Sequence, residues 1–262
     1  MWIIYLLKLL NLNSGSTISL MRLHRFYYPF TESLNETITI NDEKAHYIRN
    51  VLRIKCGRYL RIFNHLKQEY KAQITAIDRK SVEIHLQEII EPIKPSKLNI
   101  TLVQSISKGE RMDYTIQKAT ELGITTIQPI TSEFGEVKLK DKRLEKKLNH
   151  WKNISISACE QSFRVDIPHI RAPLSIQEYA SSKHTGIFLE PNESPTIQTI
   201  AQNKWQTLDV AIGPEGGWSE NDLSLLMACG LQGIQFGQRI LRTETMAPAI
   251  LAAIHSLWGD FV

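Results

Sequence analysis

The feature that most constrains the fold is a regular alternation of short apolar runs with amphipathic stretches in the last two thirds of the chain. The runs have the length and β-branched composition of buried strands, and the stretches between them repeat apolar residues at helical spacing. The predicted strands are Leu98–Val103, Thr126–Ile130, Ile187–Leu189, Val210–Ile212 and Ile234–Phe236, and the predicted helices are Met112–Leu122, Leu144–Ser162, Glu220–Cys229 and Met246–Trp258. This order predicts an α/β domain with a mainly parallel sheet.

The first third has a different texture, in which short strands follow one another with a single helix among them. Strands are predicted at His24–Tyr28, Thr37–Ile40, Tyr59–Phe63, Tyr70–Ile77 and Val82–Leu86. The helix is predicted to begin after Asn41, with Ala45, Ile48, Val51 and Leu52 on its apolar face. Such a segment is typical of a small β-barrel. The proline-containing stretch Glu91–Lys97 is a predicted linker, so we expect domains at residues 21–93 and 94–262.

Positive charge is concentrated in the first of these domains. Residues 21–94 contain 13 Lys and Arg against 9 Asp and Glu, whereas residues 95–262 contain 17 against 18. Phosphate groups attract Lys and Arg whatever the base sequence, so this asymmetry indicates a nucleic-acid partner for the N-terminal domain. A chance imbalance of surface charge is the alternative.

The cysteines and histidines indicate neither disulfides nor a metal. Cys56, Cys159 and Cys229 are odd in number and widely spaced, and no CxxC pair or HExxH motif occurs. We therefore predict no metal site and a cytoplasmic location.

Residues 1–20 precede a second methionine, Met21, which opens the run MRLHRFYYPF. The apolar run Trp2–Leu7 is followed by Lys8 and is too short to span a bilayer, so we predict no membrane partner. We expect the functional protein to begin at Met21 and residues 1–20 to be an extension. A weak membrane-directing segment is the alternative.

A glycine-rich turn follows the predicted strand Val210–Ile212, in the sequence DVAIGPEGGW. Ser219 and Asp222 then approximate a capping box that opens a helix. Glycines let the backbone approach a ligand closely, so the turn is a candidate binding site. It lacks the lysine of a P-loop, and Glu215 would repel a triphosphate, which favours a less anionic nucleotide-like ligand such as S-adenosylmethionine. A tight turn without a ligand is the alternative.

A second candidate segment is Phe236–Met246, FGQRILRTETM, which joins a predicted strand to the last helix. Thr245 is its predicted N-cap, and Pro248 would then lie in the first turn. Arg242 and Glu244 stand among apolar residues, and buried charges are costly unless they are paired or functional. They are either functional residues or a structural ion pair.

These two segments together resemble the signature of the bacterial 16S rRNA (uracil-N3)-methyltransferases, a SPOUT family. Further blocks that resemble the family are SKGERMDYTIQKATELGI, CEQSFR, HRFYYP and DEKAHYIRNVLRIKCG. The resemblance extends from about Met21 to Phe261. It implies an N-terminal PUA-like β-barrel, a C-terminal SPOUT α/β domain with a trefoil knot, and a homodimer.

The resemblance also implies S-adenosylmethionine as cofactor and 16S rRNA of the small ribosomal subunit as partner. The residues implied to bind the cofactor are Leu189, Glu190, Ile212, Gly213, Pro214, Glu215, Gly216, Gly217, Phe236, Gly237, Ile240, Leu241, Arg242 and Thr243. The expected RNA contacts are Arg25, Lys108, Arg111 and Arg164, and Lys118 is either a further contact or a partner of Glu121.

Uridine N3 carries a proton, so methylation there needs a base or a group that stabilises the deprotonated ring. Arg242 is the expected stabiliser, and Glu244 is expected to orient it or to act as base. Two departures from the family are Phe163, where a glycine is usual, and SEFG at Ser132–Gly135, which lacks an arginine often found there. The alternatives are a SPOUT enzyme with another RNA target and a non-catalytic RNA-binding or ribosome-assembly protein.

Overall fold

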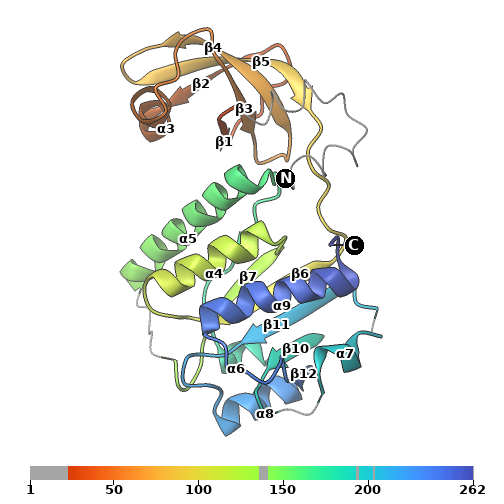
Figure 1. Cartoon of the computed structure of the whole chain (residues 1–262). Coiled ribbons are helices and arrows are strands. Elements are labelled where there is room, and N and C mark those ends of the chain that lie inside the picture. Colours follow the sequence, from red (N-terminus) through yellow and green to blue (C-terminus); the bar gives the residue numbers. More distant parts are fainter. Residues whose placement is uncertain (1–22, 136–140, 193–194, 203, 262) are drawn as a thin grey trace. The chain divides into compact units, whose positions relative to one another are not determined.

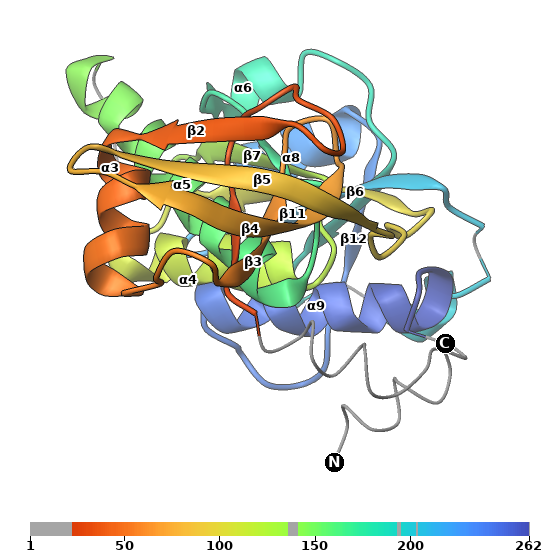
Figure 2. The ribbon, with the colours of Figure 1, turned by 90° about the horizontal axis from the view of Figure 1, so that it is seen from above.

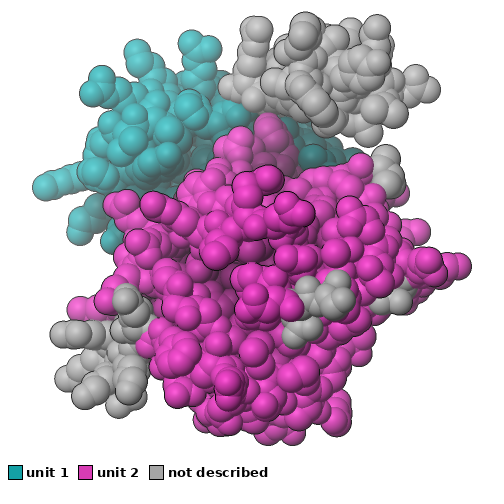
Figure 3. Space-filling model, turned by 60° about the horizontal axis from the view of Figure 1, so that its bottom comes forward, with its two compact units in different colours: residues 1–93 teal, residues 94–262 magenta. Residues whose placement is uncertain are grey.

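The structure is a computed structural model that describes residues 23–135, 141–192, 195–202 and 204–261. The chain divides after Ile93 into two compact units, which Figure 3 colours separately. The predicted extension at residues 1–20 lies outside the described residues.

The first unit is built on a curled five-stranded sheet. Its strands are β1 (Arg25–Tyr27), β2 (Thr37–Asn41), β3 (Tyr59–Phe63), β4 (Glu69–Ile77) and β5 (Ser81–Ile90), in the order β1-β3-β4-β5-β2. Strands β3, β4, β5 and β2 lie side by side in Figure 2 and pair antiparallel, whereas β1 joins β3 in parallel. All five predicted strands are present, because each carries alternate apolar side chains that enter one core.

The predicted helix of this unit is present, but its apolar face differs from the prediction. Helix α3 (Asp42–His46) continues into a π-helical turn, Tyr47–Val51. Ala45 and Ile48 are buried as predicted, whereas Val51 is exposed. In the π turn the Leu52 amide donates to the Tyr47 carbonyl five residues back, and this wider turn rotates Val51 away from the core.

The second unit is an α/β domain with a parallel sheet, as predicted. Its strands are β6 (Asn99–Ser105), β7 (Thr126–Thr131), β8 (His169–Ile170), β9 (Leu174–Ser175), β10 (Gly186–Leu189), β11 (Thr207–Ile212) and β12 (Leu231–Ile234). Their order is β12-β10-β11-β6-β7-β8, with β9 also paired to β7, and every pairing is parallel.

Helices cover both faces of this sheet (Figure 1). They are α4 (Glu110–Glu121), α5 (Asp141–Ser162), α6 (Ile176–Tyr179), α7 (Ile197–Ile200), α8 (Glu220–Ala228) and α9 (Thr243–Trp258). In β11, Val210 packs into the core under α4, α5 and α9, whereas Ala211 packs into the core under α6 and α8. This alternation explains why the strands read as continuous apolar runs, since both faces are buried.

Two boundaries near the end of the chain differ from the prediction. The strand predicted at Ile234–Phe236 ends at Ile234, and Gln235 forms only an isolated bridge with Thr196. The last helix begins at Thr243 rather than after Thr245, because the amides of Thr245 and Met246 already donate to the Arg242 carbonyl.

Pro248 consequently lies inside the last helix rather than in its first turn. A proline there donates no hydrogen bond to the carbonyl of Glu244 four residues back.

Helix α5 ends at Ser162, as predicted, and the next residue has a left-handed backbone conformation. Phe163 follows Ser162 with a φ of +63°. This left-handed conformation favours glycine, which is the residue usual in the family at this position.

Among the described residues, no helix has both the length and the apolar character needed to cross a membrane. The same part of the chain contains no group of three or more His, Cys, Asp or Glu side chains placed to hold a metal ion.

Candidate functional site

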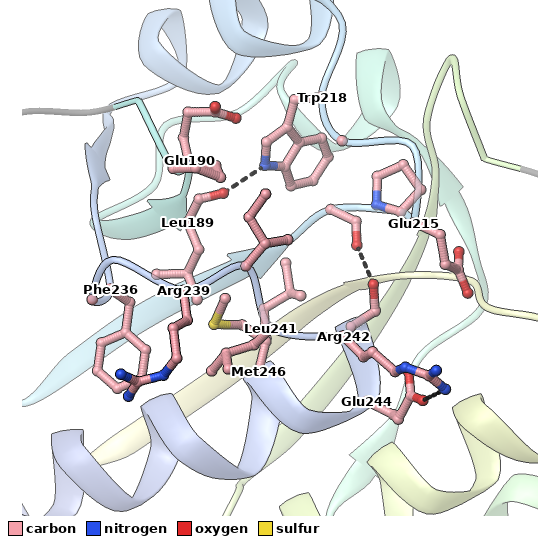
Figure 4. Close-up of a pocket in the computed structure, with 18 of the residues that line it drawn as sticks. Leu189, Glu190, Glu215, Trp218, Phe236, Arg239, Leu241, Arg242, Glu244 and Met246 are labelled. Carbon is pink, nitrogen blue, oxygen red and sulfur yellow. Dashed lines mark hydrogen bonds and ion pairs between the residues drawn. The ribbon is translucent and has the colours of Figure 1, made fainter.

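The carboxyl ends of three neighbouring strands, β10, β11 and β12, surround a cavity of about 700 Å³ (Figure 4). Ligands of open parallel sheets bind in this place, beyond the carboxyl ends of strands. The walls are the segment after β10, the glycine turn after β11, the segment after β12 and the first turn of α9. All fourteen residues predicted to bind the cofactor, together with Glu244, line this cavity.

The glycine turn after β11 is fixed at both ends. The predicted capping box is confirmed: Ser219 Oγ accepts from the Asp222 amide at 3.0 Å, and the Ser219 amide donates to Asp222 Oδ2 at 3.4 Å. The same carboxylate oxygen accepts from the Glu133 amide at 3.3 Å. Gly217 has a φ of +77°, which explains a glycine at this position.

Trp218 is a wall residue that the sequence analysis did not assign to the site. Its Nε1 donates to the Leu189 carbonyl at 3.1 Å, which ties the glycine turn to the end of β10. Its ring covers Gly213 so closely that a Cβ there would meet Trp218 Cε2 at 3.0 Å. A buried tryptophan commonly needs an acceptor for its N–H. The position of Trp218 directly after two glycines was the sequence feature that could have assigned it to the site.

We expect Trp218→Phe to lower the free energy of unfolding by about 1–2 kcal/mol, because a buried carbonyl loses its donor. Urea denaturation of the purified protein measures this. Trp151→Phe is the matched control: Trp151 is also buried, and its Nε1 has no hydrogen-bond partner among the described residues. An equal loss in both variants would show that volume, and not the Leu189 hydrogen bond, is what Trp218 contributes.

Arg242 and Glu244 lie at one end of the cavity with Glu215, and Phe236 and Arg239 lie at the other (Figure 4). Arg242 is 81% exposed, and its Nη1 approaches Glu244 Oε1 only at 4.0 Å. A pair this long and exposed adds little stability, so the contact does not explain the two charges as a structural brace. Thr243 Oγ1 donates to the Gly213 carbonyl at 3.4 Å and links this segment to the glycine turn.

The cavity combines an apolar floor with charges of both signs. Its apolar residues include Leu189, Ile212, Phe236, Leu241 and Met246, and its charged residues are Glu190, Glu215, Glu244, Arg111, Arg239 and Arg242. Arg111 Nη1 contacts Glu215 Oε1 at 2.9 Å, and both side chains are partly exposed. Such a lining suits a flat apolar ring that carries polar and charged substituents.

Two further lining residues, Pro191 and Gln235, lie outside both candidate segments and were missed by the sequence analysis. Gln238, Arg239 and Met246 lie within the candidate segment Phe236–Met246 but were not assigned individually to the cofactor. Gln235 to Arg239 also border a second, smaller cavity with Thr196, Ile197 and Gln198. Pro191 and Gln235 give no signal of a site by residue type, and the ends of β10 and β12 place them there.

Of the predicted RNA contacts, Arg25 lies in a buried ion cluster of the first unit. Its Nε and Nη2 donate to the two carboxylate oxygens of Glu69 at 2.8 and 3.1 Å, and its guanidinium lies 4.1 Å from the Phe63 ring centre. Arg61 Nε reaches the same carboxylate at 2.6 Å. Arg25 therefore neutralises a buried carboxylate within its own unit.

Arg164 is likewise engaged by its own unit, whereas Lys108 is exposed. The Arg164 guanidinium contacts the carbonyls of Thr120 and Ile124 and the Asp166 carboxylate, with Nη2 to Asp166 Oδ2 at 2.6 Å. It therefore holds the end of α4, and its geometry does not favour the predicted RNA contact. Lys118 pairs with Glu121 at 2.8 Å, the alternative left open for it.

We expect Glu69→Gln to lower the free energy of unfolding of the first unit by about 3 kcal/mol, because both guanidinium groups lose a carboxylate in a buried place. Chemical denaturation followed by circular dichroism measures the change. Glu88→Gln is the control, since Glu88 pairs with Lys71 at 3.2 Å on the surface and should cost less than about 0.5 kcal/mol. Equal losses would contradict a special role of the cluster.

Both units of the chain match families of known proteins. A family model described as an RNA methyltransferase domain matches residues 94–255, and one described as an RNA methyltransferase PUA domain matches residues 40–87. The chain is 36% identical over 243 residues to ribosomal RNA small subunit methyltransferase E of Buchnera aphidicola subsp. Schizaphis graminum, which covers 91% of this chain and 98% of that protein.

Two solved structures are similar over most of the chain. One is a ribosomal RNA small subunit methyltransferase E from Neisseria gonorrhoeae bound to S-adenosyl methionine, with a TM-score of 0.84 and 35% identity. The other is a protein from Legionella pneumophila in complex with the bound cofactor SAM, with a TM-score of 0.86 and 33% identity. Each alignment covers 92% of this chain and 100% of the other.

Proposed function

The chain belongs to the family of the ribosomal RNA small subunit methyltransferases E, and from this premise we propose that it transfers a methyl group from S-adenosylmethionine to N3 of a uridine in 16S rRNA. The observation that carries the proposal is the cavity at the carboxyl ends of β10, β11 and β12, which gathers three segments far apart in the sequence. Relatives solved with the cofactor support its identity.

The residues of the cavity fit S-adenosylmethionine by size and by chemistry. A volume of about 700 Å³ lies in the range typical of small-ligand sites. The apolar floor suits the adenine ring, and the open space at Gly217 and Gly237 lets a ligand approach the backbone. Glu190 and Glu215 would hold the cationic parts of the cofactor. When bound, the cofactor supplies an already activated methyl group.

The chain's own residues must then prepare the uracil. Arg242, exposed at one end of the cavity, would place a cation beside the uracil oxygens and stabilise the negative charge that develops as N3 loses its proton. Glu244 is 19% exposed, and its Oε1 lies 4.0 Å from Arg242 Nη1, so it would either accept that proton or orient the guanidinium. The apolar walls would exclude water from the reacting atoms.

We infer that residues 21–93 contact RNA and that residues 94–262 form the catalytic domain with its trefoil knot. We also infer that two copies of the chain assemble as a homodimer in the cytoplasm. The charge excess of the first unit supports the RNA contact. Light scattering coupled to size exclusion tests the dimer, which requires twice the chain mass of 30.0 kDa.

The substrate is tested by transfer of a labelled methyl group from S-adenosylmethionine to small ribosomal subunits, naked 16S rRNA and tRNA that all lack the modification. We expect label in 16S rRNA or in the small subunit. Label confined to tRNA would overturn the assigned target while keeping the methyltransferase. No label in any RNA, together with no cofactor binding in calorimetry, would favour a non-catalytic RNA-binding protein.

A further inference from the structure

The turn that follows β7, residues Ser132–Gly135, presents an aromatic side chain next to the candidate active site. The turn is fixed by three contacts. Ser132 Oγ lies 3.0 Å from Ser105 Oγ, the Gly135 amide donates to the Ser132 carbonyl at 3.0 Å, and the Glu133 amide donates to Asp222 Oδ2 at 3.3 Å. The same Asp222 oxygen accepts from the amide of Ser219, the N-cap of α8 directly after the glycine turn, so the two turns are held together.

Phe134 stands in this turn and is 51% exposed. Its Cβ lies against the glycine turn: a Cβ built on Gly216 would meet it at 3.2 Å. Gly216 lines the cavity and is the neighbour of Glu215, which lies at the same end as Arg242 and Glu244 (Figure 4). An exposed aromatic ring is therefore anchored beside the end of the cavity at which the uracil is proposed to react.

An exposed aromatic ring can bind an unpaired base of an RNA substrate by stacking. A base can be methylated at N3 only when that edge is unpaired, so the target and its neighbours must leave a base-paired stack. Proteins that read unstacked RNA bases stack them on aromatic side chains or on the planes of arginine side chains. Phe134 offers such a flat surface beside the glycine turn.

We propose that Phe134 stacks a nucleobase of the RNA substrate next to the target uridine. This inference rests on the proposed function for the nature of the substrate. The contact is independent of base identity, because every base has a flat face. It therefore contributes to RNA affinity and positioning, whereas the cofactor and the reacting atoms are handled by other residues.

The position of Phe134 distinguishes it from two other exposed apolar side chains of the second unit, Met227 and Leu257. Met227 and Leu257 stand on the helices α8 and α9, whereas the Cβ of Phe134 lies against Gly216 of the cavity lining. Single exposed apolar residues of this kind are ordinary on protein surfaces. Met227 accordingly serves as the matched control.

The test compares Phe134→Ala, Phe134→Leu, Phe134→Trp and Met227→Ala in the full-length protein. We expect Phe134→Ala and Phe134→Leu to raise KM for RNA between about fivefold and 100-fold, the loss usual for one stacked base. Phe134→Trp should keep the wild-type value, because it retains the stacking surface, and Met227→Ala should also keep it. The dissociation constant for S-adenosylmethionine, measured by calorimetry, should be unchanged in all four.

Fluorescence anisotropy with a labelled single-stranded fragment of 16S rRNA gives the RNA affinity without catalysis, so the inference is tested even if the proposed reaction fails. An unchanged RNA affinity in Phe134→Ala would overturn it, and so would a full rescue by Phe134→Leu. A molar mass that falls in Phe134→Ala would assign the ring to a contact between two copies of the chain and would likewise overturn it.

Discussion

Arg242→Ala should lower kcat for methyl transfer by about 10²- to 10³-fold, the usual loss when one group that stabilises a developing anion is removed. The uracil ring gains negative charge as N3 loses its proton, and Arg242 is a highly exposed cation at that end of the cavity. The alanine variant leaves the apolar floor untouched, so the dissociation constant for S-adenosylmethionine should change little. Single-turnover kinetics with saturating RNA, together with calorimetry for the cofactor, measure both quantities.

Arg239→Ala is the matched control for this prediction. Arg239 is an exposed arginine of the same segment that lines the opposite end of the cavity. It should affect kcat far less than Arg242→Ala does. Arg242→Lys should recover part of the rate, because it restores the charge without the planar guanidinium. An Arg242→Ala variant with normal kcat and weakened cofactor binding would contradict the proposed role.

Gly186→Ala should destabilise the second unit by at least about 4 kcal/mol, which combines steric overlap with backbone strain. Gly186 begins β10 with a φ of +154°, and its register partner is Asp209 of β11. A Cβ there would lie 1.9 Å from the Asp209 carbonyl oxygen. The two strands would have to separate, and they carry Leu189 and Ile212 into the cavity, so cofactor binding should be lost as well.

Thermal and urea denaturation measure this loss. Gly109→Ala is the control, since Gly109 also has a left-handed φ, +59°, while a Cβ there meets nothing within 4 Å. Its cost should be limited to backbone strain, about 1 kcal/mol or somewhat more. If both variants lose the same stability, the close approach of β10 and β11 is not what requires glycine at position 186.

The arrangement of the second unit could be predicted from sequence because its signals are local. Strands buried on both faces read as apolar runs, and the glycines after Ile212 end one of them visibly. Trp218 could not be assigned in this way, since its acceptor, the Leu189 carbonyl, is 29 residues away. The predicted start of α9 was wrong because threonine is a better N-cap residue type than arginine. The helix nevertheless begins after Arg242, whose side chain makes no capping hydrogen bond.

The predicted RNA contacts show the limit of reasoning from charge. Sequence shows that Arg25 and Arg164 are cationic, but not that Glu69 and Asp166 face them. An arginine whose guanidinium is bound by carboxylates and carbonyls of its own domain contributes to the stability of that domain. Conversely, one departure from the family corresponds to a backbone feature, since Phe163 has a left-handed conformation that favours glycine.

Methylation of uridine N3 at this cavity is tested most directly by nucleoside mass spectrometry of 16S rRNA after reaction with S-adenosylmethionine. Small subunits that lack the modification should yield 3-methyluridine with the wild-type protein and far less of it, in the same reaction time, with Arg242→Ala. A methyl group found on a ribose hydroxyl, on another base, or equally with both proteins would contradict the claim.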